Sequence, residues 1–509
     1  MGMRARHFVK PTAAVLAMMP LLAGCNVSQS SSSTKASTTD YTIRMYAGGF
    51  TPIKPTKLNP DPPTALQTLA KQYEKIHPNI KIKFVTEPLA LGTTYNDYAG
   101  WLTTQGDAGT APDIVWDQWL QVNGGFVPKG FFTNLAPYLK QPDPYVSGNK
   151  HWGDLFNPVF QQELTNQDGS ILAIDGDYVD AALVYNKSIF KKVGIKTLPT
   201  TFADLTSDLM KIKQAGFIPL AYDLSDQTGT SWWERMAATE FLQPDIAKFN
   251  VDHQTSTLSP LDYAVGIEWG YIQMTNPRYA EVWKLLKQFS NTWDSGSTQI
   301  TNSPPAAGNS LVSSLQLVAQ GKAAVAWAAS SSIPWLNNSG FSKVYGVLPF
   351  PVITKATSSY SANLDVQAVV GGPNGNFQYF VPTQKANHTL TPDKLKWVIN
   401  WLQFIATPQN SAKVVDQVGG TVPTMVGAKA TNKDLLTLIP TKKVPLSVGS
   451  FNLDLGAQAT DDLIRLVQAY ITNQLSYDAF ASQFDTKLQN AAAAWAAQNN
   501  VDLSKYKTK

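Results

Sequence analysis

Apolar side chains near the start of the folded chain switch between strand-like and helix-like spacing, and this alternation constrains the fold most. Residues 43–45 and 80–84 alternate apolar and polar side chains, as half-buried strands do, and a short apolar run follows at 114–116. Between the first two, residues 66–76 place apolar side chains on one helical face, with Thr64 as the expected cap. Strand, helix and strand in this order predict a parallel sheet with crossover helices.

The same alternation continues to the end of the 509-residue chain. Further strands are expected at 171–174, 181–185, 323–327 and 344–348, and further helices at 202–212, 395–405, 463–471 and 491–497. So many alternations exceed one compact sheet. The sequence therefore predicts an α/β fold with two sheets.

The only cysteine of the chain, Cys25, marks a processing site. A basic start precedes an apolar run from Ala13 to Ala23, which Pro20 interrupts and which is shorter than the about 20 residues of a membrane span. A cysteine directly after Ala23-Gly24 resembles the lipobox of bacterial lipoproteins. That resemblance implies a signal peptide at 1–24, cleavage before Cys25 and lipidation of Cys25. The alternative is a free cysteine behind an ordinary signal peptide.

Composition argues against nucleic-acid binding and indicates a flexible tether and an acidic habitat. Removal of residues 1–24 takes away three basic residues and leaves 38 basic against 37 acidic ones, so the mature chain has no basic surface typical of nucleic-acid binding. Residues 25–40 are rich in Ser and Thr, as in a flexible tether. Charged residues are only 15% of the chain, and a surface with so few charges favours an acidic habitat.

Catalytic and metal-binding patterns are weak in this sequence. The five histidines show no metal-ligand spacing, and neither a nucleophile elbow nor a phosphate-binding loop occurs. The carboxylates at 175–180 lack the Gly and Glu positions of a calcium loop, although a glycosidase pair among them stays open as an alternative. We therefore expect no enzyme, no metal and no cofactor.

Aromatic residues give the positive signal. The chain holds 14 Trp, and Trp116, Trp232, Trp233 and Trp335 are expected where strands end or loops begin. An indole ring stacks on the apolar face of a sugar, while neighbouring carboxylates such as Asp117 bind hydroxyl groups, and ligand pockets combine both kinds of group. The alternative is that each Trp fills the core. Taken together, the set favours a carbohydrate pocket.

A longer resemblance supports this interpretation. The segment from Ala181 to Ile195 carries a hydrophobic strand, Tyr-Asn-Lys, a short helix and Gly194, and Pro199 and Thr201 follow before the next helix. This pattern, with Ala111-Pro112-Asp113 and Gly321-Lys322-Ala323 in the same order, resembles the family 1 extracellular solute-binding proteins. Physically, Asn186 and Thr201 can cap the two helices, and Gly194 allows a left-handed exit.

The resemblance implies a periplasmic-binding-protein-like fold (type II) of two discontinuous lobes with the ligand in the cleft between them. By that pattern, lobe one holds 41–178 and 346–420, and lobe two holds 183–345 and 421–505. The first hinge crossing lies at about 179–182. Ligand contacts carried over from the family pattern are Tyr46, Trp116, Asp117, Asp177, Tyr178, Trp232, Trp233 and Trp335.

From these features we expect a monomeric, lipid-anchored protein outside the cytoplasmic membrane. It would capture a carbohydrate, an oligosaccharide in particular, and deliver it to the permease subunits of an ABC importer. Two alternatives stay open, namely a binding protein for a non-sugar solute such as a peptide or polyamine, and a lipoprotein glycoside hydrolase.

Overall fold

The structure is a computed structural model, and its first sheet follows the alternation near the start of the chain. The residues that it describes are 39–55, 62–86, 95–118, 126, 129–166, 168–224, 227–293, 311–341, 343–367, 375, 377–418, 421–429, 431, 433–440, 442–451, 455 and 457–506. Residues 40–509 form one compact unit by their contacts. Cys25 and the proposed signal peptide lie outside the described residues.

The first sheet has five strands in the order β2-β1-β3-β10-β4. Their bounds are β1 Tyr41–Tyr46, β2 Ile80–Phe84, β3 Ile114–Trp116, β4 Ala173–Asp175 and β10 Gln378–Phe380. Strand β1 pairs in parallel with both β2 and β3, as predicted, whereas β10 runs antiparallel between β3 and β4. A strand from late in the chain is therefore inserted into the sheet built by its start.

The second sheet has four strands in the order β7-β8-β6-β9. Their bounds are β6 Ala181–Asn186, β7 Ile218–Ala221, β8 Ala323–Ala329 and β9 Tyr345–Pro349. Only β7 and β8 pair in parallel, because β6 runs antiparallel to both of its neighbours. Strand β9 extends to Pro349, a few residues past 345, where this stretch of lobe two was expected to end.

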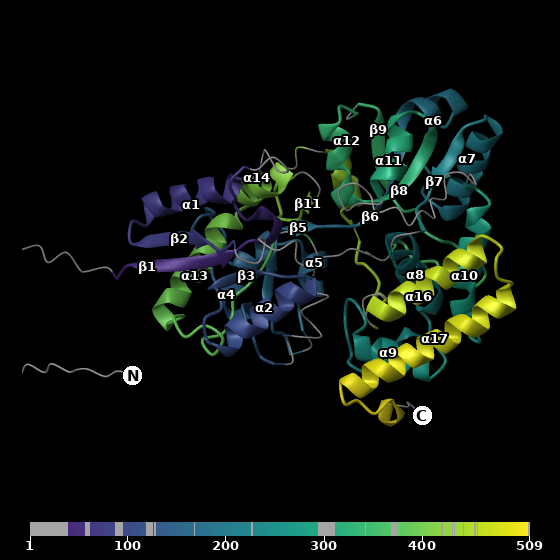
Figure 1. Cartoon of the computed structure of the whole chain (residues 1–509). Coiled ribbons are helices and arrows are strands. Elements are labelled where there is room, and N and C mark those ends of the chain that lie inside the picture. The colour runs from purple at the N-terminus through teal and green to yellow at the C-terminus, as the bar shows by residue number, and fades with distance from the viewer. Residues whose placement is uncertain are drawn as a thin grey trace, which may run out of the picture. The chain divides into compact units, whose positions relative to one another are not determined.

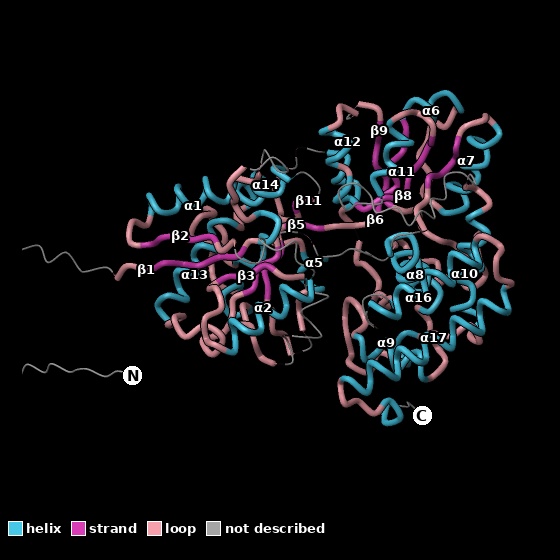
Figure 2. Tube along the Cα trace, viewed as in Figure 1, coloured by secondary structure: helices cyan, strands magenta, loops and turns pink. Residues whose placement is uncertain are grey.

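A two-stranded ladder joins segments on the path between the sheets. Strand β5 (Asp177–Tyr178) pairs antiparallel with β11 (Val422–Pro423). The stretch from 421, expected in lobe two, thus begins beside β5. The chain passes from the first sheet to the second at residues 179–180 and returns between β9 and β10; after β11 it continues into the last helices of the chain, at 433–438, 457–471 and 477–498 (Figure 2).

Helices surround both sheets (Figure 1). Those before β9 are α1 Ala65–Ile76, α2 Tyr95–Asp107, α4 Ala136–Leu139, α5 Pro158–Glu163, α6 Lys187–Val193, α7 Phe202–Gln214, α8 Gln227–Leu242, α9 Pro260–Glu268, α10 Pro277–Ser290, α11 Leu311–Ala319 and α12 Pro334–Asn338. Those after it are α13 Pro392–Ile405, α14 Pro408–Val418, α16 Ala457–Ile471 and α17 Tyr477–Gln498.

Local helix signals in the sequence are mostly confirmed. Asn186 caps α6 by accepting hydrogen bonds from the amides of Ser188 and Ile189, both at 3.0 Å. Gly194 ends this helix with a left-handed φ of 82°. Thr201 caps α7 in a reciprocal capping box with Asp204. Local sequence therefore determines where these helices begin and end.

Thr64 is a correction to the predicted caps. It lies at the N-cap of α1, but its side chain makes no capping bond. Instead the side-chain oxygen of Gln417 (Oε1) accepts hydrogen bonds from the amides of Thr64 and Ala65, at 2.9 and 2.6 Å. A residue from α14, 353 positions away, thus satisfies the first amides of α1.

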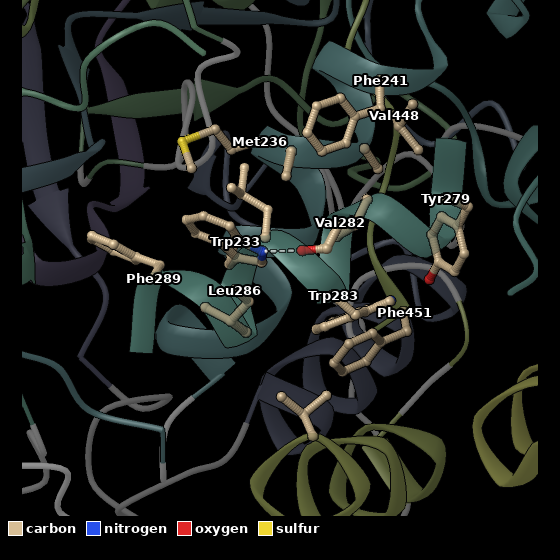
Figure 3. Close-up of a cluster of buried hydrophobic side chains, with 14 of the residues drawn as sticks. Trp233, Met236, Phe241, Tyr279, Val282, Trp283, Leu286, Phe289, Val448 and Phe451 are labelled. Carbon is tan, nitrogen blue, oxygen red and sulfur yellow. Dashed lines mark hydrogen bonds between the residues drawn. The ribbon is translucent and has the colours of Figure 1, made fainter. Parts of the chain in front are cut away.

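Aromatic residues fill the core of the second lobe (Figure 3). Trp233 of α8 has no exposed surface and donates from its indole nitrogen to the Val282 carbonyl oxygen at 2.9 Å. Its ring stacks on Phe289, with centroids 5.7 Å apart. Trp283 of α10 packs against Phe484 of α17 in the same core. Helices α8, α10 and α17 are therefore held together by buried rings.

Carboxylates and hydroxyls of α8 also anchor segments that return from far along the chain. Glu240 accepts hydrogen bonds from the Ser361 hydroxyl at 2.6 Å and the Asn363 amide at 2.8 Å. Asn363 has a left-handed φ of 61°, which orients that amide. The Thr239 hydroxyl accepts from the Val448 amide at 2.8 Å. Helix α8 thereby fixes two connecting segments that form no strand.

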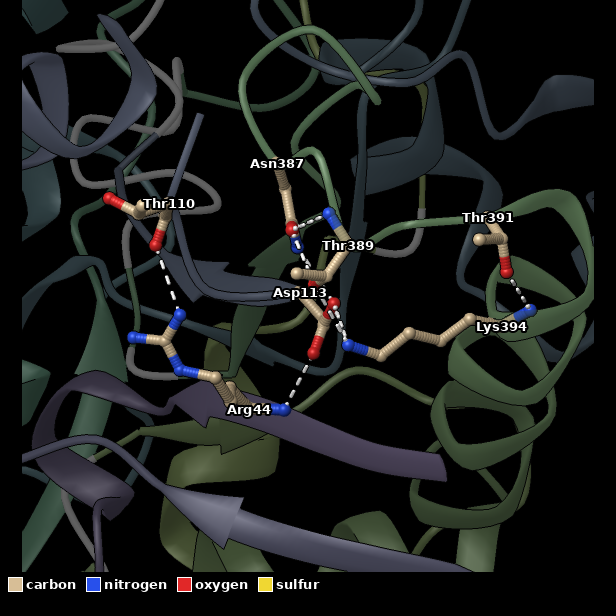
Figure 4. A network of polar contacts seen from close by, with 7 residues as sticks. All are labelled: Arg44, Thr110, Asp113, Asn387, Thr389, Thr391 and Lys394. Carbon is tan, nitrogen blue, oxygen red and sulfur yellow. Dashed lines mark hydrogen bonds and ion pairs between the residues drawn. The ribbon is translucent and has the colours of Figure 1, made fainter. Parts of the chain in front are cut away.

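In the first lobe, a buried ion pair anchors segments that are far apart in the chain (Figure 4). Asp113, at the start of β3, has no exposed surface and lies 2.8 Å from the Lys394 ammonium of α13. The carboxylate also accepts hydrogen bonds from the Arg44 amide and the Asn387 side chain, both at 2.7 Å. These contacts join β1, β3 and the loop before α13.

Removing the partner of a fully buried charge costs about 3–5 kcal/mol. We expect Lys394→Met to lower the free energy of unfolding by about 3 kcal/mol, measured by urea denaturation. Lys396→Met is the matched control on the same helix, because the Lys396–Asp393 pair is 75% and 70% exposed. That control should change stability by less than about 1 kcal/mol. Equal effects of the two substitutions would contradict this assignment.

Candidate functional site

An aromatic group forms where two parallel strands of the first sheet end. Tyr46 is the last residue of β1 and Trp116 is the last of β3, with ring centroids 6.3 Å apart in an edge-on arrangement. Tyr98 of α2 lies 5.2 Å from the Tyr46 ring, and its hydroxyl donates to the Trp116 carbonyl oxygen. Tyr46 is buried, whereas Trp116 is partly exposed. Ligands of α/β sheets bind at such carboxyl ends.

Glycine backbone fixes the Trp116 ring. The indole nitrogen donates to the Gly375 carbonyl oxygen at 3.0 Å. Gly48 packs so closely that a Cβ there would lie 2.5 Å from the ring, and its φ of 56° is left-handed. Only glycine suits both demands at position 48. The exposed part of the Trp116 ring is therefore held in one orientation.

Asp117 follows directly and is fully buried, and its carboxylate accepts the Gln118 amide at 2.7 Å. Burial, together with the nearby Asp117 charge, raises the pKa of Tyr46 to about 12. The Tyr46 phenol therefore stays protonated and can donate a hydrogen bond at neutral pH.

Asp177 and Tyr178 lie in β5, and in this structure both serve the crossing between the sheets. The Asp177 carboxylate accepts hydrogen bonds from the Phe377 amide at 2.8 Å and the Thr421 hydroxyl at 2.6 Å. Tyr178 is fully buried and packs on Phe160 of α5, with centroids 4.4 Å apart. Gly375 touches Asp177 and also accepts the Trp116 hydrogen bond. The structure thus brings Tyr46, Trp116, Asp117 and Asp177 together.

Trp232 and Trp233 do not lie in a loop, as the sequence had suggested, but on helix α8. The sequence prediction failed because α8 is buried on nearly every side, so no polar face marks it as a helix. Trp233 belongs to the core, while Trp232 is partly exposed and packs against the edge of the same core.

The remaining predicted contact, Trp335, lies in the first turn of α12 and is partly exposed. Its ring stacks on Phe341 with centroids 6.3 Å apart. Three of the eight predicted residues, Trp116, Trp232 and Trp335, are therefore partly exposed, and the other five are buried.

Glu234, the neighbour of Trp233, makes hydrogen bonds that hold several elements of the second lobe together. Its carboxylate accepts hydrogen bonds from the Tyr263 and Tyr279 hydroxyls at 2.5 and 2.6 Å, and from the Phe451 amide at 3.1 Å. Although these three donors lower the pKa, complete burial outweighs them and raises the pKa of Glu234 to about 7. This carboxyl group ties α8 to α9, α10 and the segment before α16.

A charged group that sequence reasoning missed lies between helices of the two lobes. Arg235 of α8 donates to the Ser447 and Thr257 hydroxyls, both at 2.9 Å. Gln162 of α5 donates to the Thr255 carbonyl oxygen at 3.0 Å, which brings α5 to the same segment. Glu163, next to Gln162, is buried. No local motif marks this contact, because its members are far apart in the sequence.

Charge–charge interactions connect Glu163 with Arg235 and with the neighbouring aspartates. Burial raises the pKa of Glu163 to about 7, while the Arg235 charge opposes that rise and the Asp180 charge adds to it. Burial, with Asp177 and Glu163 nearby, raises the pKa of Asp175 well above its ordinary range. In the described part of the chain, no three His, Cys, Asp or Glu side chains are arranged to hold a metal ion.

The sequence matches the bacterial extracellular solute-binding proteins over residues 58–412, which is more than half of the chain. The chain belongs to this family. No curated protein matches the sequence. Among the described helices, none combines the length and apolarity needed to cross a membrane.

Solved structures of other solute-binding proteins share the fold. A probable secreted solute-binding lipoprotein from Streptomyces coelicolor aligns with a TM-score of 0.60 at 15% identity, over 88% of this chain and 98% of that one. The bacterial solute receptor AcbH aligns with 0.60 at 15%, over 89% and 98%. A chitin oligosaccharide binding protein aligns with 0.55 at 17%, over 89% and 99%. The two-lobe α/β fold expected from the family resemblance is confirmed.

Family membership determines the general role. Proteins of this family bind a solute outside the cell membrane and deliver it to an ABC transporter, and they are not enzymes.

The raised pKa of Glu234 predicts a pH dependence of stability. The folded state holds this proton more tightly than the unfolded chain, where the pKa is near its ordinary 4.5. The resulting stabilisation is complete below about pH 4.5 and is lost as pH rises through about 7. From pH 5 to pH 8 we expect the free energy of unfolding to fall by roughly 1–3 kcal/mol through this group.

The comparison that isolates Glu234 uses two variants. Glu234→Gln should flatten the fall in stability between pH 5 and 8, measured by urea denaturation at each pH. Glu268→Gln, an exposed position at the end of α9, should keep the wild-type slope. The assignment fails if Glu234→Gln retains the full slope.

Proposed function

We propose that this solute-binding protein captures a carbohydrate, an oligosaccharide in particular, and delivers it to an ABC importer. The observation that carries the proposal is the Trp116 ring, partly exposed and held by Gly48 and Gly375 at the carboxyl edge of β1 and β3. A fixed indole face suits the apolar face of a sugar ring, since little conformational freedom is lost on binding.

Sugar-binding relatives support the solute class. AcbH is described as having an exclusive preference for β-D-galactopyranose, and another relative of the same fold is a chitin oligosaccharide binding protein. Both are below 20% identical to this chain, so they support a sugar without identifying it.

The roles of the predicted residues follow from their exposure. Trp116, Trp232 and Trp335 would supply the stacking surfaces, because these three are partly exposed. Tyr46, Asp117, Asp177 and Tyr178 are buried, so they would reach sugar hydroxyls only when the lobes move apart. Trp233 is buried in the core of the second lobe, which leaves Trp232 as the exposed member of the pair. Closure around the solute is the signal that the permease subunits recognise.

A thermal-shift screen of mono- and oligosaccharides tests the proposal. A cognate sugar at 100 times its dissociation constant should stabilise the protein by about 2.7 kcal/mol. Galactose and chitin oligosaccharides are the first compounds to include. A shift with a polyamine or a peptide and with no sugar would replace the proposal by the non-sugar alternative. Shortened sugar products after incubation would instead indicate a glycosidase.

Trp232→Ala should weaken binding of the sugar found in that screen about tenfold or more, which corresponds to about 1.4 kcal/mol. The measurement is isothermal titration calorimetry. Trp495→Ala is the matched control, because Trp495 is also partly exposed and packs against the same core, but lies on α17. Unchanged affinity in Trp232→Ala would remove Trp232 from the binding surface.

We also propose that Cys25 is lipidated and tethers the mature, monomeric chain to the membrane. Cys25→Ala should then move the protein from the membrane fraction to the soluble fraction, while the purified variant binds the same sugar with unchanged affinity. Retention in the membrane fraction without detergent would contradict the lipid anchor.

A further inference from the structure

The Trp116 ring is oriented by a residue that belongs to no strand. Its indole nitrogen donates to the Gly375 carbonyl oxygen at 3.0 Å, and this bond joins positions 259 residues apart. Gly375 is buried, and a Cβ at this position would collide with the Asp177 carboxylate. The carboxylate therefore lies directly against the Gly375 backbone, so a movement of Asp177 also moves the acceptor of the Trp116 hydrogen bond.

Two segments hold the Asp177 carboxylate, each through a different oxygen. Its Oδ1 accepts a hydrogen bond from the Phe377 amide at 2.8 Å, and its Oδ2 accepts one from the Thr421 hydroxyl at 2.6 Å. The last side-chain torsion of an aspartate has broad minima, so hydrogen-bond donors determine how the carboxylate is turned. A hydrogen bond to a charged carboxylate is also about twice as strong as one between neutral groups. Thr421 thus helps to orient the carboxylate that supports Gly375.

The backbone around Asp177 is held independently of the Thr421 side chain. Thr421 directly precedes β11, which pairs with β5 and places Pro423 opposite Asp177. The Phe377 carbonyl oxygen accepts a hydrogen bond from the Gly176 amide at 2.9 Å. Loss of the Thr421 hydroxyl would therefore loosen the Asp177 carboxylate while leaving these backbone contacts in place.

We propose that Thr421 is a positioning residue of the solute site. Its hydroxyl holds the Asp177 carboxylate against Gly375, and Gly375 in turn holds the Trp116 ring in the orientation that a solute meets. Thr421 itself is buried and acts through these residues. The effect on the ring needs no ligand, whereas the effect on sugar affinity rests on the function proposed above.

The indole N–H signal of Trp116 reports this effect without a ligand. In NMR spectra of the full chain with isotope-labelled tryptophan, it is the signal absent from Trp116→Phe. Thr421→Val keeps the size of the side chain but removes the donor, so the signal should move upfield as the bond to Gly375 weakens. Exchange of the indole proton with deuterium should become about three- to tenfold faster, the factor expected for one neutral hydrogen bond. An unchanged signal and exchange rate in folded Thr421→Val would overturn the proposal.

Two further substitutions separate the hydroxyl from a general disturbance of this stretch. Thr421→Ser keeps the hydroxyl and should restore the wild-type signal and exchange rate. Thr424→Val is the matched control, because Thr421 and Thr424 are both 3% exposed, but the Thr424 hydroxyl lies 3.4 Å from its acceptor, the Asp175 carbonyl oxygen. This control should leave the Trp116 signal in place. Equal shifts in Thr421→Val and Thr424→Val, or no recovery in Thr421→Ser, would mean that the hydroxyl does not orient the ring.

The route through Asp177 is tested with Asp177→Ala, which has no carboxylate. This substitution alone should move the Trp116 signal, and adding Thr421→Val should then move it no further, because both changes remove the same link. If Thr421→Val alone does not fold by circular dichroism, Thr421→Ala takes its place with the same expected shift. An unmoved signal in Asp177→Ala, or a further shift in the double variant, would overturn the proposal.

The sugar that stabilises the wild-type chain in the thermal-shift screen completes the test. Thr421→Val should weaken its binding about three- to tenfold by calorimetry, because a less rigid ring loses more freedom on binding, and Thr421→Ser should restore the affinity. A Trp116 signal that moves without a change in affinity would mean that Thr421 does not serve the solute site. If no sugar binds the wild-type chain, the sugar proposal fails, while the Trp116 signal still decides whether Thr421 positions the ring.

Discussion

The polar side chains of α8 are the constraint on which the second lobe depends. A chain that passes three times between two lobes leaves long segments without strand partners, and these segments must be held by other means. Glu234 and Thr239 hold the segment before α16 by accepting hydrogen bonds from the amides of Phe451 and Val448, and Glu240 holds the segment between β9 and β10 by accepting one from Asn363. Each carboxylate is buried, so its desolvation is acceptable only with the donors in place. The helix and the returning segments therefore stabilise one another, and Trp233 packs in the core beside them.

In the first lobe, the buried ion pair of Asp113 and Lys394 likewise holds distant segments together. Asp113 directly precedes β3, which ends in Trp116, so the contacts that fix Asp113 also fix the start of the strand that carries the candidate sugar surface. Two residues, Ile114 and Val115, separate this anchor from Trp116, which leaves the ring little freedom. The position of the candidate stacking surface thus depends on how β3 is anchored.

Sequence reasoning succeeded where the signal is local and failed where the partner is remote. Asn186, Gly194 and Thr201 act on neighbours within three residues, and their roles were predicted correctly. Thr64 was expected to cap α1, yet Gln417 satisfies those amides from 353 positions away, a distance at which no spacing rule operates. Helix α8 was missed because burial on nearly every side removes the amphipathic stripe from which helices are recognised. The group of Glu163 and Arg235 was missed because it forms only when α5 and α8 meet. The sequence thus predicts the elements and the family, while tertiary contacts decide which of the predicted aromatic residues remain exposed.

The segments that connect the two sheets also position the candidate sugar surface. Asp177 and Thr421 fix the β5–β11 ladder beside the Trp116 group, because the Thr421 hydroxyl donates to the Asp177 carboxylate at 2.6 Å. Gly375, whose carbonyl oxygen accepts from the Trp116 indole, packs against the same carboxylate. Rotation of one lobe against the other must change the backbone angles of these segments, so it also acts on the contacts that orient the Trp116 ring.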